Sequence, residues 1–233
     1  MSWNEIDSNI NGSFATDTLG SAVCISADGS IIAVSANGIS ANNRNGGYVR
    51  LYKKNGNEWE QIGSDITGEK AGDTFGSGLS LSDDGSIIAI GAKTNNPIAH
   101  SLYGVDIPLV AAGHVRVYQN INNQWVQIGS DIDGEAAGDL FGSSVSLSSN
   151  GDYLAVGAPR NQGVNGFWSG HVRVYKNINN TWVQQGSAIN GEAYNDGSGS
   201  SISLSSDGSI IAIGAPKTQG MELVVGMFVF TKI

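Results

Sequence analysis

Carboxylates recur at two positions of a repeated pattern, and their oxygens are suited to holding a cation. One position is aspartate in all four copies: Asp17, Asp73, Asp139 and Asp196. A second position holds Glu69, Glu135 and Glu192, with Ser13 in the remaining copy. We expect no cofactor, but carboxylate oxygens are ligands that Ca²⁺ prefers, so the four aspartates are candidate ligands for calcium. The alternative is that each aspartate accepts backbone N–H bonds within its own turn.

A second candidate site is a set of aromatic and polar residues in loops that differ between the copies. A glycine-rich segment contains Phe167 and Trp168 beside Asn165 and Arg160, and a long insertion at 93–112 contains His100 and Tyr103. Aromatic rings beside such polar groups suit sugar stacking or a protein hot spot. These six residues are the predicted ligand-binding residues. The alternative is that the apolar residues of the insertion cap the fold or form a dimer contact.

Other reactive side chains follow the repeat and are expected to be structural. His114 and His171 share their position with Tyr48 and Met227, which predicts packing rather than metal binding. Cys24 stands where the other copies have serine, and a single cysteine excludes a disulfide within the chain. No carboxylate pair departs from the repeat, so no catalytic residues are assigned.

Four tryptophans define the repeat. Trp3, Trp59, Trp125 and Trp182 are separated by 56, 66 and 57 residues, and Gly20, Gly76, Gly142 and Gly199 follow the same three steps. Self-similarity at such a period predicts a propeller or a solenoid, whose units cannot each bury a core of their own.

Each copy contains four strand-like runs. The third copy has an alternating run at 144–148, a turn at Asn150-Gly151, an apolar run at 153–159 and a second alternating run at 171–175. The next tryptophan begins the fourth run. Asn-Gly and Asp-Gly pairs predict a tight type I′ hairpin. Four short antiparallel strands per repeat predict a propeller blade.

The two ends of the chain predict how the propeller closes. The chain starts with a fourth-type strand around Trp3–Ile6 and stops after a third-type strand at Met227–Lys232. Pairing these strands would complete the last blade. We therefore predict an all-β fold: one closed four-bladed β-propeller domain over residues 1–233. Its repeats lie at about 3–58, 59–124, 125–181 and 182–233. An open solenoid, or two chains joined into an eight-bladed ring, are the alternatives.

Short motifs add a family resemblance. Phe75-Gly76 and Phe141-Gly142, followed by Gly157-Ala-Pro159 and Gly214-Ala-Pro216, resemble the FG-GAP repeat. That family builds the β-propeller of integrin α-subunits and of many bacterial and viral surface proteins. The first copy departs from the motif, with Leu19-Gly20 in place of Phe-Gly. Many integrin-type repeats contain a D-x-D-x-D-G calcium loop, and the equivalent hairpins here do not, so the resemblance implies no calcium loop.

Composition limits the possible partners. The 233 residues include 33 glycines and 4 prolines, and the formal net charge is −9. Nucleic acid is not an expected partner, because binding to phosphates needs clustered basic residues. Membrane insertion is not expected either, since no apolar run approaches the roughly 18 residues of a spanning helix. The first residues lack the pattern of a signal peptide. We expect a virion-associated or cell-surface location, reached by a non-classical route, rather than a cytoplasmic role.

Constant scaffolds with one variable face usually use that face for recognition. We therefore predict a non-enzymatic recognition or adhesion module that binds a glycan or a protein surface. The first alternative is a structural subunit of a virion or surface assembly, with self-association or particle assembly. The least favoured alternative is a glycoside hydrolase that uses two carboxylates.

Overall fold

Alternating apolar and polar residues, interrupted by glycine turns, form a structure of short antiparallel strands. The computed structural model describes residues 9–13, 17–38, 46–96, 98–102, 105–108, 110–216 and 227–232, with side chains described outside 98–108 and 227–232. These residues form twenty strands and no helix. Accordingly, the described part of the chain contains no helix long and apolar enough to cross a membrane.

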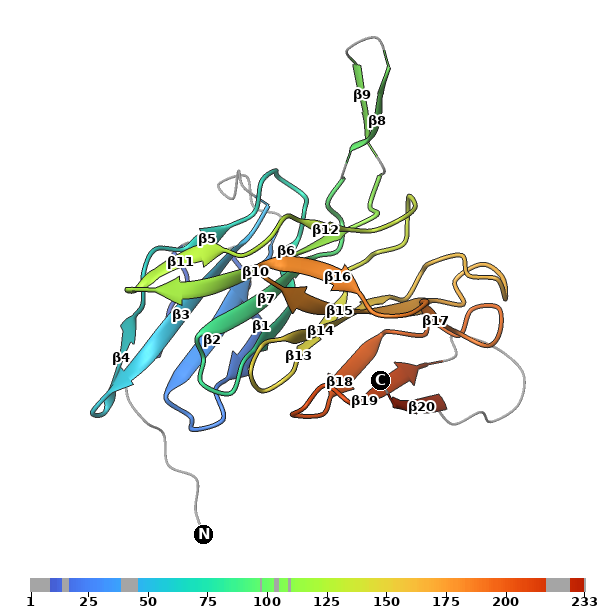
Figure 1. Ribbon diagram of the computed structural model, residues 1–233. Helices are drawn as coiled ribbons and strands as arrows, with labels where there is room; N and C mark the ends of the chain where they lie inside the picture. The colour runs from blue at the N-terminus through green and yellow to red at the C-terminus, as the bar shows by residue number, and fades with distance from the viewer. Residues whose placement is uncertain are drawn as a thin grey trace.

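Four sheets correspond to the four repeats (Figure 1). Blade one contains β1 (Leu19–Ile25), β2 (Ile31–Ala36), β3 (Tyr48–Asn55), β4 (Glu58–Gln61) and β5 (Ile66–Thr67). Blade two contains β6 (Phe75–Leu81), β7 (Ile87–Ala92), β10 (His114–Ile121), β11 (Gln124–Gln127) and β12 (Ile132–Asp133). Blade three contains β13 (Ser144–Leu147), β14 (Tyr153–Ala158), β15 (His171–Ile178), β16 (Thr181–Gln184) and β17 (Ile189–Asn190). Blade four contains β18 (Ser201–Leu204), β19 (Ile210–Ala215) and β20 (Met227–Lys232). The predicted four-bladed all-β propeller fold is confirmed.

The hairpin between the first two strands of each blade differs from the predicted type I′ turn. In blade three, Gly151 has a φ of 73°, but Asn150 is not among the residues with positive φ. The N–H of Gly151 donates to the carbonyl of Ser148, and the N–H of Ser148 donates to the carbonyl of Tyr153. The loop is therefore a four-residue connection at 149–152, the length that is most often built around a type I turn.

The fourth strand of each complete blade is divided into two pieces, where the sequence predicts one. In blade one, β4 pairs with the second half of β3 (Gln61 opposite Tyr52), and β5 pairs with its first half (Ile66 opposite Val49). Gly63, with a φ of 70°, lies between the two pieces. A glycine in this conformation interrupts a strand at little steric cost.

The insertion in blade two forms a hairpin of its own, β8 (Ile98–Leu102) and β9 (Val105–Pro108). Figure 1 shows that this hairpin projects away from the four sheets and does not cover them.

Neighbouring blades pack face to face through apolar cores. Leu51 and Val49 of blade one pack with Phe75 and Ile90 of blade two, and equivalent clusters join blades two and three and blades three and four. Cys24 packs against the first of these cores, where burial raises the pKa of its thiol to about 12.

Two of the repeated tryptophans attach the outer strand of their blade to the preceding blade. Trp125 Nε1–H donates to the carbonyl of Ile62 at 3.1 Å, and Trp182 Nε1–H donates to the carbonyl of Ile128 at the same distance. A buried indole needs such an acceptor. Two of the tryptophans that define the repeat therefore have a structural role.

The first strands of the blades lie in the order β1, β6, β13 and β18, and each packs against the next. Figure 1 shows β1 and β18 at opposite ends of this row. The predicted strand at Trp3–Ile6, and hence its pairing with β20, lies outside the described residues. Closure of the ring, and the assignment of the whole chain to one domain, stay predictions.

Candidate functional site

The loops that enter each blade and the loops between its second and third strands meet on one face. Asn95 Nδ2 donates to Asp73 Oδ2 at 3.0 Å, and Asn161 Nδ2 donates to Asp139 Oδ2 at 2.8 Å. In each of these blades the aspartate joins one loop set to the other.

The four repeated aspartates are buried and make local hydrogen bonds. Asp73 accepts the N–H of Lys70 at 2.9 Å, and Asp139 accepts the N–H of Ala136 at 3.0 Å. Asp196 accepts two N–H groups of its own turn, and Asp17 accepts the hydroxyl of Tyr48 at 2.8 Å. Burial raises the pKa of Asp139, although these hydrogen bonds oppose the shift. These contacts support the structural alternative, and calcium binding at these positions stays a prediction.

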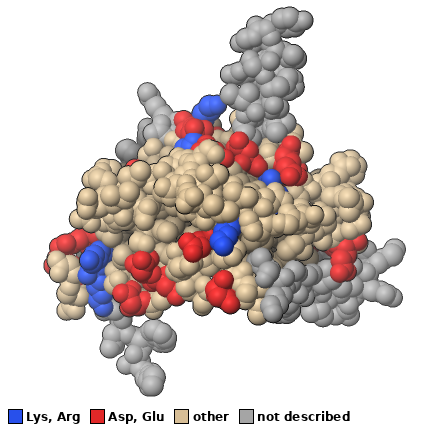
Figure 2. All heavy atoms as spheres, in the orientation of Figure 1, with Lys and Arg blue, Asp and Glu red and all other residues tan. Residues whose placement is uncertain are grey.

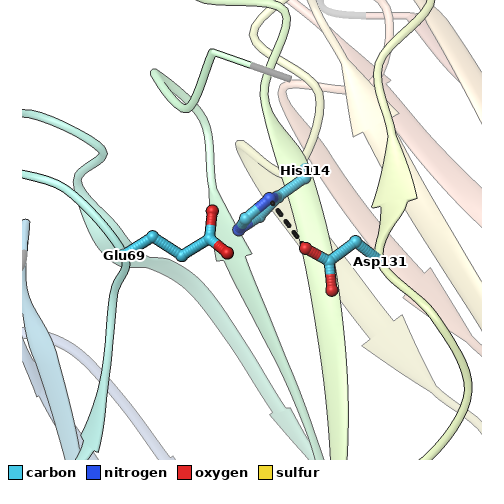
Figure 3. Close-up of side chains that lie close together, drawn as sticks. All are labelled: Glu69, His114 and Asp131. Carbon is cyan, nitrogen blue, oxygen red and sulfur yellow. Dashed lines mark ion pairs between the residues drawn. The ribbon is translucent and has the colours of Figure 1, made fainter. Parts of the chain in front are cut away.

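In the described part of the chain, one group of three acidic or histidine residues has ligand atoms within 4.8 Å of one another: Glu69, His114 and Asp131. His114 lies on β10, Asp131 lies just before β12, and Glu69 lies in the loop before β6 (Figure 3). His114 Nδ1 is 3.6 Å from Asp131 Oδ2. Burial lowers the pKa of His114, so the imidazole is neutral at pH 7. By residue type alone, this group could bind a metal.

Arg116 already provides the cation for this group. Its Nε is 3.0 Å from both carboxylate oxygens of Asp131, its Nη2 is 2.9 Å from Oδ2, and Nη2 also pairs with Glu69. Burial would raise the pKa of Asp131, but hydrogen bonds from Arg116 and Gln127 outweigh it and lower the pKa. A metal ion would have to displace the guanidinium. The carboxylate also lacks the raised pKa that a general acid in glycoside hydrolysis requires.

The same arginine contact recurs in the neighbouring blades. Arg173 Nη1 pairs with Glu135 at 3.2 Å, and Arg50 Nη2 donates to the hydroxyl of Ser13. At the second acidic position of the repeat, Glu69 and Glu135 are therefore paired with arginine side chains. Sequence reasoning missed these contacts of the arginines. The signal was available, because the arginine and its partner recur at fixed positions in three copies.

Phe167 and Trp168 are exposed aromatic residues in a loop that backbone hydrogen bonds fix in place. Their side chains are 60% and 47% exposed, and Trp168 has a φ of 56°. The N–H of Asn195 donates to the carbonyl of Phe167, and the N–H of Gly197 donates to the carbonyl of Trp168, both at 3.0 Å. The loop of blade three is thus attached to the loop that enters blade four.

Trp168 forms one wall of a pocket between blades three and four. The guanidinium carbon of Arg160 is 5.7 Å from the centroid of the indole, a cation–π distance. The pocket has a volume of about 400 Å³ and is lined by Pro159, Arg160, Trp168, Asn195, Gly197, Ser200 and Pro216. Among these lining residues Arg160 is the one charged side chain, in a protein of net charge −9.

The blade that provides this loop also has a recognisable sequence. The FG-GAP repeat model matches residues 131–175, which span most of blade three. Blade three resembles the FG-GAP repeat. The predicted resemblance is confirmed over this region. The comparison with curated proteins returned no match.

Solved structures similar to this chain show the fold alone. A putative 6-phosphogluconolactonase from Bacteroides uniformis is 12% identical with a TM-score of 0.52, over 82% of this chain and 46% of that one. A putative TolB from Agrobacterium tumefaciens is 14% identical with a TM-score of 0.46, over 93% of this chain and 58% of that one. The Cps50 (Swd1) β-propeller domain from Myceliophteria thermophila is 10% identical with a TM-score of 0.48, over 83% and 49%. The chain therefore matches about half of the length of each of these proteins.

The structure brings two of the predicted ligand-binding residues together, Arg160 and Trp168. Asn165 Nδ2 donates to the carbonyl of Gly191 at 2.7 Å, so this side chain helps to fix the loop of blade three. Phe167 is adjacent but does not line the pocket. His100 lies on the projecting strand β8, and Tyr103 lies outside the described residues.

Sequence reasoning missed Asn195, Ser200 and Pro216, which line the other side of the pocket. They belong to the following repeat, and they reach the pocket because the two blades pack together. The loop that enters blade four lies beside the variable loop of blade three. Considering these two loops together in the sequence could have identified Asn195 and Ser200.

Figure 2 shows Lys and Arg side chains on its visible face as separate groups beside acidic ones, without a continuous basic surface. The prediction that nucleic acid is not a partner rests on this distribution and on the net charge.

Proposed function

We propose that this protein is a non-enzymatic recognition module that binds a carbohydrate through the pocket around Trp168. The observation that supports this most directly is an exposed indole in a fixed loop, at a backbone position where the fold does not require an aromatic residue. The similarity to the FG-GAP repeat and the propeller fold also suggest a binding module.

Blade two shows that the fold does not need Trp168. Ala111 has a φ of 54° and its carbonyl accepts the N–H of Leu140, as the carbonyl of Trp168 accepts the N–H of Gly197. The two residues therefore occupy equivalent backbone positions, one with a methyl group and one with an indole. A bulky residue with positive φ is unusual, and such residues tend to occur at binding sites.

The chemistry around the indole suits a sugar that bears a carboxylate. An aromatic ring stacks on the apolar face of a sugar, and a few polar groups at the rim fix its orientation. Asn195 and Ser200 line the pocket beside Trp168. Arg160 can form a bidentate ion pair with a carboxylate, so an acidic sugar should bind more tightly than its neutral counterpart.

A protein surface is the second possible ligand, because exposed tryptophan and arginine are also typical of protein hot spots. The enzymatic alternative is weaker, since Arg116 pairs with both Glu69 and Asp131, and its hydrogen bonds help to lower the pKa of Asp131. A cell-surface or virion-associated location would bring such a module into contact with glycans.

A glycan panel that includes uronic and sialic acids tests the proposal with the purified protein and two variants. We expect Trp168→Ala to abolish binding and Phe167→Ala to retain it, because Phe167 is more exposed but lies outside the pocket lining. Absence of binding to every glycan, or equal loss in both variants, would overturn the proposal.

A further inference from the structure

One row of backbone hydrogen bonds runs through the blades from hairpin to hairpin. The N–H of Ala27 donates to the carbonyl of Asp83 at 2.9 Å, and the N–H of Asp83 donates to the carbonyl of Ser149 at 2.8 Å. The N–H of Ser149 in turn donates to the carbonyl of Ser206 at 2.9 Å. Each junction between blades therefore has the same bond. At the ends of the row, the carbonyl of Ala27 and the N–H of Ser206 make no such bond with any described residue.

A second contact also repeats between neighbouring blades, with the later blade as the donor. Ser80 Oγ accepts the N–H of Leu147, and Ser146 Oγ accepts the N–H of Leu204, both at 2.9 Å. The next pair in this series would be Ser203 Oγ and the N–H of Ile25. These two groups lie on β18 and β1, at opposite ends of the row of first strands.

Blade one packs on blade two with one face, and we call its other face the open face. This open face is apolar and exposed. Val23 and Ile25 are 70% and 61% exposed, whereas their equivalents in blade three, Val145 and Leu147, are 8% and 7% exposed because blade two covers them. A groove of about 470 Å³ follows this face and is lined largely by apolar side chains of β1 and β2. A side chain built on Gly20 would meet no atom within 4 Å, whereas one on Gly142 would lie 2.6 Å from the carbonyl oxygen of His114.

The open face of blade four is complementary. Ile87 packs against the hairpin of the next blade, where a side chain on Gly151 would lie 2.6 Å from its Cδ1. Ile210 occupies the equivalent position in blade four and is 48% exposed. In blade one, Gly29 is the residue equivalent to Gly151. By the same pattern, Ile210 would pack against Gly29.

We propose that the open face of blade four docks on the open face of blade one of a second copy, through the same contacts that join blades within the chain. A single copy has one face of each kind. Two copies have two complementary pairs, which a twofold axis can satisfy together. Docking within one chain would instead have to bring β1 and β18 together by changing three junctions that are already packed and hydrogen-bonded.

Light scattering after gel filtration, combined with a mixing experiment, tests this interface. We expect the wild type at twice its chain mass of 24.2 kDa. Ile25→Asp and Ile210→Asp should each be monomeric, because a buried unpaired charge disrupts both junctions. A 1:1 mixture of the two variants should recover dimers, since one intact face of each kind remains. Val126→Asp, which adds the same charge to an exposed position on β11, should stay dimeric.

The mixture distinguishes docking between two copies from closure of the ring within one chain, because only docking between copies lets one variant restore dimers with the other. A monomeric wild type up to its solubility limit would overturn the proposal, and so would a mixture that stays monomeric. Circular dichroism of each variant should match the wild type, because the substituted side chains are exposed in the single chain.

Discussion

Arg116 and Asp131 form a close ion pair, with Nη2 of the arginine 2.9 Å from Oδ2 of the aspartate. Arg50 and Asp65 form the equivalent ion pair in blade one, with Nε of the arginine 2.8 Å from Oδ1 of the aspartate. Blade three departs from the pattern, because Ala188 stands where blades one and two have aspartate. As a result, the buried Nε of Arg173 has no hydrogen-bond partner among the described residues.

Ala188→Asp should therefore stabilise the protein. A new charge-assisted hydrogen bond to a buried donor contributes roughly 1.5–3 kcal/mol, of which we expect about 1 kcal/mol after the cost of desolvating the carboxylate. Urea unfolding measures the change. Ser187→Asp adds the same charge at the adjacent exposed position and should have little effect, so equal stability of the two variants would contradict the account.

His171 should make stability depend on pH. Burial, together with the nearby charge of Arg173, lowers the pKa of His171 to about 4 from its usual 6.5. The unfolded chain binds a proton between these values and the folded chain does not, so stability is lost as the pH falls from about 6.5 to 4.

Met227 occupies the position of the repeat that is equivalent to His171. The variant His171→Met should therefore be tolerated and should remove this part of the pH dependence. The slope of unfolding free energy between pH 6.5 and 4 should be lower in the variant than in the wild type. Identical slopes would show that His171 does not titrate in this way.

Much of the fold follows from repeated residues that act locally. Alternation in the runs at 144–148 and 171–175 predicts strands, and the spacing of the tryptophans predicts four blades. The hairpin type was wrong because Asn150 alone does not determine whether its φ is positive; the length of the loop also does. The division of the fourth strand at Gly63 was not predicted for a similar reason. A glycine in a strand can mark either a bulge or a turn, and the residue type alone does not decide between them.

The candidate site was harder to predict, because its residues come from different blades. Trp168 stands out in the sequence as a tryptophan outside the repeated position. Asn195 and Ser200 lie beside it only because blade four packs on blade three. The pairing of Arg116 with Glu69 likewise depends on the path of the loop entering blade two, and alternation in a strand contains no information about that path.

Calcium should have little effect on stability. The repeated aspartates already accept hydrogen bonds within the protein, and Arg116 occupies the space between Glu69 and Asp131. Thermal unfolding with added CaCl₂ and with EDTA should give the same Tm. A rise of several degrees with calcium, reversed by EDTA, would show that these carboxylates bind the ion.

Trp168→Gly should leave the fold intact and raise its stability slightly. A non-glycine residue in the left-handed region costs about 1 kcal/mol, and glycine removes that cost while gaining some freedom in the unfolded chain. Ala111→Gly, at the equivalent position of blade two, should change the unfolding free energy by a similar amount. A large loss of stability in Trp168→Gly alone would mean that the indole supports the fold.

The most direct test of the recognition pocket is ¹⁹F NMR of protein labelled with 5-fluorotryptophan. The chain has five tryptophans, and Trp168→Phe assigns the resonance of interest. We predict that a glucuronic acid-containing disaccharide shifts the Trp168 resonance selectively, and that the matching neutral disaccharide shifts it less. A Trp168 resonance that does not respond to either sugar, or a response centred on another tryptophan, would contradict a carbohydrate site between blades three and four.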